Sequence, residues 1–196
     1  MTYALSLRGL TKTFGQKTAV NALNLDIPAG SFYGLVGPNG AGKTTTLQMS
    51  TGMLLPTSGS VSLFDTDVWS NIDAVRAQMG VMPQADEIFD RLTGQQLLVY
   101  AGLLRGMDKD EVVRRSEDLL KAFDLADAAS KIVSDYSTGM KKKICLAMAM
   151  IHSPRILFLD EPFEAVDPVS SANLKDILKE YVATGGTVVI SSHVMS

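Results

Sequence analysis

The sequence has a single cysteine, Cys145, among its 196 residues. One thiol excludes an internal disulfide, and so low a cysteine content is typical of proteins from a reducing compartment. Cys145 stands between Ile144 and Leu146, where we expect a buried and unreactive thiol. Cysteine usage therefore offers no candidate for redox or nucleophilic chemistry.

Long hydrophobic runs are also absent. No stretch approaches the about 20 apolar residues that a membrane-spanning helix needs. Residues 1–8 alternate apolar and polar side chains and lack the apolar centre of a signal peptide. We therefore expect a cytoplasmic protein, and any membrane-spanning part of its assembly has to come from another polypeptide.

An excess of basic residues is missing as well. The 18 lysines and arginines are outnumbered by 21 acidic residues, for a formal net charge of −3. Nucleic-acid-binding proteins usually carry a basic surface, so no nucleic-acid partner is expected. What is present, 46% hydrophobic and 20% charged residues without repeats or linkers, fits one globular domain.

Hydrophobic periodicity predicts an α/β fold. Alternating or short apolar runs predict strands over residues 4–8, 19–27, 31–36, 60–64, 155–159 and 187–190. Helical patterns cover residues 43–51, 92–123, 139–151 and 168–182, with a new helix start at Asp108. We therefore predict a mainly parallel sheet, an N-terminal antiparallel β region and an inserted helical subdomain from about Phe89 to Ile151. The core would comprise residues 1–88 and 152–196.

A glycine-rich turn between the strand at 31–36 and the helix at 43–51 fits the phosphate-loop pattern G-x-x-x-x-G-K-[ST]. Backbone N–H groups of such a turn, with the N-terminus of the next helix, bind phosphate oxygens. Lys43 would reach the β- and γ-phosphates, and the Thr44 hydroxyl would ligate Mg²⁺. The predicted nucleotide-binding residues of this motif are Gly37, Pro38, Asn39, Gly40, Ala41, Gly42, Lys43, Thr44 and Thr45.

Two carboxylates follow the apolar strand at residues 155–159. Ligands of α/β sheets bind at the carboxyl ends of the strands, where Asp160 and Glu161 stand. Asp160 would hold the Mg²⁺ shell, and Glu161 would polarise the attacking water. An Asp-Glu pair at a strand end also arises by chance, but its combination with a phosphate loop favours the functional interpretation.

With these motifs, the chain resembles the ATP-binding cassette (ABC) ATPases along nearly its whole length. Phe14 matches the aromatic residue on which adenine stacks. Gln84 matches the catalytic-site glutamine that senses Mg²⁺ and faces the transmembrane partner, and His193 matches the switch histidine. Taken alone, Phe14 could be a core aromatic, Gln84 a turn residue and His193 a histidine at a strand end. Their order along the chain favours the functional interpretation.

The family signature, Leu-Ser-Gly-Gly-Gln, corresponds to residues 136–140, and the D-loop to residues 164–167. The resemblance implies that Ser137, Gly139 and Asp167 contact a nucleotide bound to the opposite subunit. Two ATP molecules with Mg²⁺ would then lie between two nucleotide-binding domains. A separate transmembrane subunit would hold the protein on the inner face of the cell membrane.

The signature departs from its commonest form at Thr138 and Met140. Both residues resemble the variant found in exporters of drugs, lipids and polysaccharides, and residues 90–94 resemble that subgroup too. We therefore predict an ATPase that powers export. Lysines 141–143 crowd the first turn of the next helix; we interpret them as a solvated basic face rather than as charges compensated by phosphate or by a partner.

Relatives of this family continue beyond the switch histidine, so we expect the chain to be truncated at its C-terminus. The alternative function is a soluble ABC ATPase that acts on ribosomes or DNA. Such proteins carry a second cassette with a charged linker, or long coiled coils, and neither is present in these 196 residues. A GTPase or a kinase would leave the signature unexplained.

Overall fold

The computed structural model describes residues 2–193, which divide into two units. The first unit contains the described residues 2–79, 155–162 and 181–193, and the second contains residues 80–154 and 163–180. Among the described residues, no helix combines the length and the apolar character that crossing a membrane requires. The predicted single domain, with an insertion from Phe89 to Ile151, stays a prediction.

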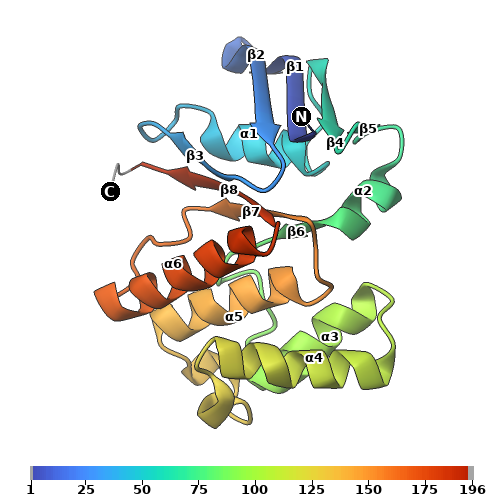
Figure 1. Cartoon of the computed structure of the whole chain (residues 1–196). Helices are drawn as coiled ribbons and strands as arrows, with labels where there is room; N and C mark the ends of the chain where they lie inside the picture. Colours follow the sequence, from blue (N-terminus) through green and yellow to red (C-terminus); the bar gives the residue numbers. More distant parts are fainter. Residues whose placement is uncertain (1, 194–196) are drawn as a thin grey trace. The chain divides into compact units, whose positions relative to one another are not determined.

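An antiparallel sheet opens the first unit, with the strand order β2-β1-β4-β5 (Figure 1). Its strands are β1 (Tyr3–Phe14), β2 (Lys17–Pro28), β4 (Ser58–Leu63) and β5 (Thr66–Asp67). Leu5, Leu7 and Leu10 of β1 are almost completely buried. Strand β1 pairs with β2 on one side and with β4 on the other, so it is an inner strand whose apolar face is covered.

A second sheet has the order β3-β8-β7-β6. It consists of β3 (Phe32–Val36), β6 (Met79–Val81), β7 (Ile156–Asp160) and β8 (Thr187–Ser192). Strand β8 pairs in parallel with β3 on one side and with β7 on the other. Its Val188 and Val189 are fully buried, as the all-apolar composition of residues 188–190 predicts for a central parallel strand.

The parallel register brings the functional segments to one edge of this sheet. Val36 pairs with Ser192, and Asp160 pairs with Ser191, so β3, β7 and β8 all end at the same level. The chain leaves β3 through the phosphate loop and enters helix α1 (Lys43–Ser50). Helix α2 (Ile72–Gln78) completes the regular elements described for this unit.

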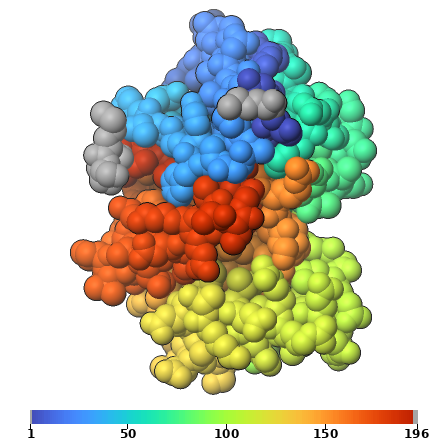
Figure 2. Space-filling model, in the orientation of Figure 1, coloured from blue at the N-terminus to red at the C-terminus, as the bar shows by residue number. Residues whose placement is uncertain are grey.

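Helices dominate the second unit. They are α3 (Gly94–Leu104), α4 (Lys109–Ala122), α5 (Thr138–Met150) and most of α6 (Pro168–Ala183), with short 3₁₀ turns at Ala126–Ala128 and Val133–Asp135. Thr93 caps α3 in a reciprocal capping box with Gln96, and Asp108 caps α4 as predicted. Figure 2 shows the surface over α3 and α4 in yellow-green and yellow.

The predicted fold class is confirmed: an α/β fold with an N-terminal antiparallel sheet, a parallel sheet and a group of helices. All six predicted strands exist, although β1 is longer than expected and reaches Phe14. Helix α2 and the short strands β5 and β6 were not predicted. They contain too few residues for a clear hydrophobic period.

The predicted solvated basic face on α5 is wrong. Lys142 and Lys143 are only 9% and 8% exposed, and Lys141 is half-buried. Helix α5 contacts both α3 and α4, and its own residues 144–147, which follow the lysines, are buried. The long aliphatic parts of the lysine side chains are therefore covered together with their apolar neighbours.

Candidate functional site

The phosphate loop is held tightly between β2 and the end of β8. The Gly37 N–H donates to the Ser192 carbonyl at 3.2 Å, which fixes the start of the loop. Gly42, the residue before α1, has φ of +89°. A Cβ atom on Gly42 would lie 2.5 Å from the Ala19 carbonyl oxygen, so only glycine fits at this position.

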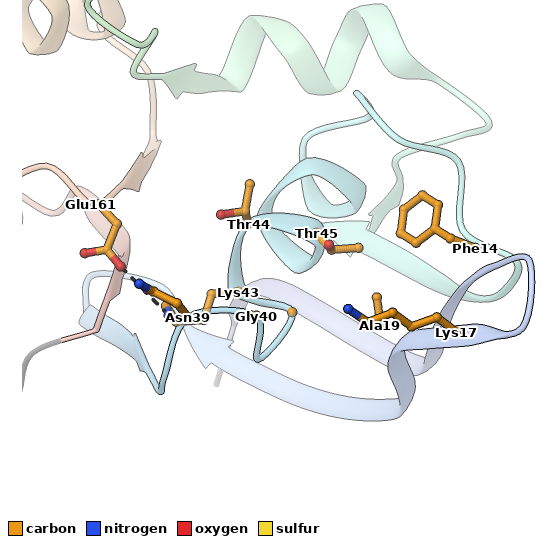
Figure 3. Close-up of a pocket in the computed structure, with 10 residues that line it drawn as sticks. Phe14, Lys17, Ala19, Asn39, Gly40, Lys43, Thr44, Thr45 and Glu161 are labelled. Atoms are coloured by element: carbon orange, nitrogen blue, oxygen red, sulfur yellow. Dashed lines mark ion pairs between the residues drawn. The ribbon is translucent and has the colours of Figure 1, made fainter.

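Lys43 folds back into this loop. Its Nζ donates to the carbonyls of Gly37 at 2.7 Å and Pro38 at 3.1 Å. The same ammonium lies 3.8 Å from Oε1 of Glu161 (dashed in Figure 3), and the Lys43 side chain is 10% exposed. The lysine therefore places its charge at the centre of the loop, where an anion would be attracted.

Oxygen atoms suited to Mg²⁺ meet beside the loop. The Thr44 hydroxyl donates to Oδ2 of Asp160 at 2.8 Å, and the Ser191 hydroxyl donates to Oδ1 of the same carboxylate. Mg²⁺ binds hard oxygen ligands, usually one or two protein groups together with water and substrate phosphates. The hydroxyl of Thr44 and the carboxylate of Asp160 fit that donor set.

Glu161 follows Asp160 with a left-handed backbone, at φ of +46°. Its two carboxylate oxygens have different neighbours, since Oε1 faces Lys43 and Oε2 lies 3.0 Å from Nδ1 of His193. The His193 N–H also donates to Oε2, at 3.3 Å. A non-glycine residue held in this strained conformation at the end of a parallel strand is typical of functional sites.

Lys43, Thr44 and Glu161 line one cavity, whereas Asp160 and His193 are not among its lining residues. The cavity has a volume of about 330 Å³, and Figure 3 shows Phe14 on one side and Glu161 on the other. Cavities of a few hundred cubic ångströms are typical of ligand sites. Phe14 is 50% exposed and faces this cavity, so it is not a core aromatic. The lining residues are Phe14, Lys17, Ala19, Asn39, Gly40, Gly42, Lys43, Thr44, Thr45 and Glu161.

The four remaining predicted residues lie in the second unit. Ser137 caps α5 by accepting the Met140 N–H at 3.2 Å. Gly139 approaches the D-loop so closely that a Cβ atom would lie 2.6 Å from Ser170 Oγ and 2.9 Å from Asp167 Oδ2. The Ser170 N–H donates to Asp167 at 2.9 Å, and this bond lowers the pKa of the Asp167 carboxyl.

Gln84 lies in a turn of the second unit, where its N–H donates to the Glu87 carboxylate at 3.2 Å. Its predicted role in sensing Mg²⁺ stays a prediction. Tyr136, the first signature residue, is buried and donates its hydroxyl to the Ala128 carbonyl at 2.7 Å, so it packs the helical unit. Cys145 is buried as predicted, and its burial raises the thiol pKa to about 12.

Three residues of the site were not predicted, namely Lys17, Ala19 and Ser191. Lys17 faces the cavity because it pairs with Phe14 across the turn between β1 and β2. Ser191 contacts both strand-end carboxylate residues, since it pairs with Asp160 between neighbouring strands. The alternation of Lys17 with Ala19 was a usable signal for the first residue. Ser191 had none, because β-strand pairing is not visible in a single sequence.

The chain is similar to known ATP-binding proteins. Residues 20–164 match the family model described as ABC transporter. The bacitracin transport ATP-binding protein BcrA of Enterococcus faecalis is 38% identical over 198 residues, which cover 100% of this chain and 63% of BcrA. The daunorubicin/doxorubicin resistance ATP-binding protein DrrA of Streptomyces peucetius is 37% identical, over 97% of this chain and 58% of DrrA. The chain thus spans about three-fifths of the length of these relatives.

Solved structures are similar as well. The protein cbiO1 of Clostridium perfringens, described as part of the ABC transporter complex cbiONQ, superposes with a TM-score of 0.86 and is 25% identical. The similarity covers 99% of this chain and 80% of that one. A second structure, described as the ATP binding subunit of an ABC transporter, also has a TM-score of 0.86, at 27% identity, and covers 97% of this chain and 80% of its own.

Proposed function

Because this chain belongs to the ABC transporter family, we propose that it binds and hydrolyses ATP to power export through a separate transmembrane subunit. The observation that carries the proposal is one cavity lined by Phe14, Lys43, Thr44 and Glu161. This combination offers a stacking surface, a cation for phosphate, an oxygen ligand for Mg²⁺ and a carboxylate base. The stacking surface serves binding of the base, and the other three groups serve phosphoryl transfer to water.

In the first unit, some residues bind the nucleotide and others act in its hydrolysis. Phe14 receives the adenine, and residues 37–45 hold the phosphates through their backbone N–H groups and through Lys43. Thr44 and Asp160 would hold Mg²⁺, and a bound Mg²⁺ would supply positive charge for the phosphates. Glu161 accepts the proton of the attacking water while His193 holds the other oxygen of its carboxylate.

The second unit contributes the surface for a second nucleotide-binding domain. Ser137 and Gly139 lie at the N-terminus of α5, whose dipole favours an anion. We infer that they complete the ATP site of the opposite copy, with Asp167 beside them, and that Gln84 relays the occupancy of the Mg²⁺ site to the transmembrane subunit. The assembly would work as a dimer on the inner face of the cell membrane.

Two observations support transport, and export in particular. BcrA is named a bacitracin transport protein and DrrA a drug-resistance protein. The signature of this chain, Tyr136-Ser137-Thr138-Gly139-Met140, also resembles the exporter variant. The test is affinity purification of the tagged natural protein from solubilised membranes. A polytopic membrane subunit that copurifies at a stable ratio is expected, whereas copurifying ribosomes or DNA would contradict the proposal.

Phe14→Ala should weaken nucleotide binding about 5- to 150-fold, because stacking of a base on an aromatic ring contributes about 1–3 kcal/mol. Stacking depends little on which base is stacked, so ATP and GTP should lose affinity by the same factor. Equilibrium binding measures both. The matched control is Phe32→Ala, which removes another exposed phenylalanine of the same unit, outside the cavity. Equal affinity of Phe14→Ala and the unmodified chain would leave the aromatic ring without a role in binding.

A further inference from the structure

Ser191 connects the two carboxylate residues of the site. Its hydroxyl donates to Oδ1 of Asp160 and accepts the Glu161 N–H at 3.0 Å. The residue is fully buried on the central strand β8, next to Asp160 on β7. One hydroxyl group therefore uses both its donor and its acceptor capacity on neighbouring functional residues.

The contact to Asp160 determines which carboxylate oxygen is available. Since Oδ1 is occupied by the buried Ser191 hydroxyl, Oδ2 is turned toward the Thr44 hydroxyl, at 2.8 Å. Oδ2 and Thr44 are the atoms that fit a Mg²⁺ shell. Without the Ser191 hydroxyl, the carboxylate could rotate away from this orientation, and groups that orient a metal ligand commonly affect metal affinity or activity about 10- to 100-fold.

The hydrogen bond between Ser191 and Glu161 stabilises a residue whose backbone is strained. Glu161 has φ of +46°, a conformation that is unfavourable for a non-glycine residue and persists only where its surroundings hold it. The Ser191 Oγ is the acceptor of the Glu161 N–H. This bond keeps the backbone in the turn that directs the Glu161 carboxylate toward Lys43 and His193.

We propose that Ser191 is a positioning residue for hydrolysis, which orients Asp160 toward the metal and holds Glu161 in its strained backbone. The inference rests on the proposed ATPase function. It predicts that loss of the Ser191 hydroxyl lowers the affinity for the metal ion and the kcat. The affinity for ATP should not change, since Ser191 is not among the residues that line the nucleotide cavity.

Ser191→Ala should bind ATP in EDTA as the unmodified chain does, within about twofold. In the presence of ATP, it should need about tenfold more Mn²⁺ for saturation, measured by electron paramagnetic resonance, and its kcat should fall about 10- to 100-fold with little change in KM. Ser191→Cys keeps the side chain's volume with a weak donor and should show the same defect if Ser191→Ala does not fold.

The matched control is Ser116→Ala, which removes another fully buried hydroxyl, one that donates to the Val113 carbonyl at 2.7 Å in the helical unit. It should leave the Mn²⁺ requirement and kcat unchanged. The proposal is overturned if Ser191→Ala keeps its Mn²⁺ requirement and kcat, or if Ser116→Ala shows the same changes. Failure of the unmodified chain to bind ATP at all would overturn the proposed function itself, and the role of Ser191 with it.

Lys17 carries a second, independent inference. It pairs with Phe14 across the two-residue turn of Gly15 and Gln16, so both side chains project from the same face of the sheet. Both line the cavity, together with Ala19 two residues further along β2. In Figure 3, the Lys17 side chain extends from the hairpin toward Gly40 of the phosphate loop.

The two cations of the cavity differ in their partners. The Lys43 ammonium is bound by two carbonyls of the loop and lies near Glu161. Within residues 2–193, the Lys17 side chain has no hydrogen bond or ion pair. Its charge lies between the Phe14 ring and the phosphate loop, and a nucleotide seated on both would place its α-phosphate there. The geometry points to Lys17 as a contact of the α-phosphate, on the assumption that the cavity binds ATP.

Lys17→Gln should weaken ATP, ADP and GTP binding by one common factor of about three to ten, as expected for a partly exposed charge-assisted contact. Its affinity should also depend less on salt concentration. Gln16→Glu is the matched control, because it makes the same change in net charge at the neighbouring turn residue, outside the cavity. Equal loss in both variants, loss for only one nucleotide, or no loss would overturn the inference. Absence of ATP binding by the unmodified chain would contradict the proposed function as well.

Discussion

Glu161→Gln should bind ATP as tightly as the unmodified chain and hydrolyse it about 10²–10⁴-fold more slowly, the usual effect of removing a general base. The substitution keeps the size of the side chain and an oxygen for the His193 contact, but it removes the group that accepts the proton of water. Glu161 also shares an edge of the cavity with Lys43, at 3.8 Å. Loss of its negative charge should therefore not weaken phosphate binding.

The measurement is single-turnover hydrolysis of radiolabelled ATP by the natural assembly, alongside the affinity for ATP. Glu180→Gln, the same substitution on an exposed position of α6, is the control and should change neither quantity. Turnover by Glu161→Gln within about threefold of normal would show that another group is the base. Loss of ATP binding would instead show that Glu161 shapes the cavity.

Lys43→Met should weaken ATP binding about 10- to 100-fold, because hydrogen bonds to a charged group contribute about 1.5–3 kcal/mol. The lysine has the best-defined position among the cations of the site, since its ammonium is bound by Gly37 and Pro38 inside the loop. Its replacement by an uncharged chain of similar length removes the attraction for the β- and γ-phosphates and leaves the apolar stem in place.

Displacement of a fluorescent ATP analogue measures this loss, with Lys109→Met as the control because Lys109 is an exposed residue at the start of α4. The loss should be larger for ATP than for AMP, which lacks the phosphates that Lys43 is expected to reach. An equal loss for ATP and AMP would point to a collapsed loop. Unchanged ATP affinity would exclude Lys43 from binding.

The phosphate loop could be predicted from the sequence because its function depends on consecutive residues. The turn, Lys43 and Thr44 stand side by side in the chain, directly after a short apolar strand that was visible in the sequence. Asp160 and Glu161 were predicted for the same reason, as the end of an apolar strand. The α/β class followed from the alternation of these elements.

Features that depend on pairing or packing between distant segments were missed. The role of Ser191 arises only because β8 pairs in parallel with β7 in a register that opposes Ser191 and Asp160, 31 positions apart. Lys142 and Lys143 were expected in solvent because lysines usually are, but both are buried in the folded chain. Local sequence contains neither the strand register nor the helices that will pack around α5.

The most direct test of the central claim is the binding and turnover of ATP by the unmodified chain. Equilibrium dialysis with radiolabelled ATP and Mg²⁺, followed by analysis of the bound nucleotide, measures both. The cavity that contains Phe14, Lys43 and Glu161 predicts one ATP per chain, competed by ADP, with release of inorganic phosphate that requires Mg²⁺. No binding at millimolar ATP, or binding that persists unchanged in Lys43→Met, would contradict the account.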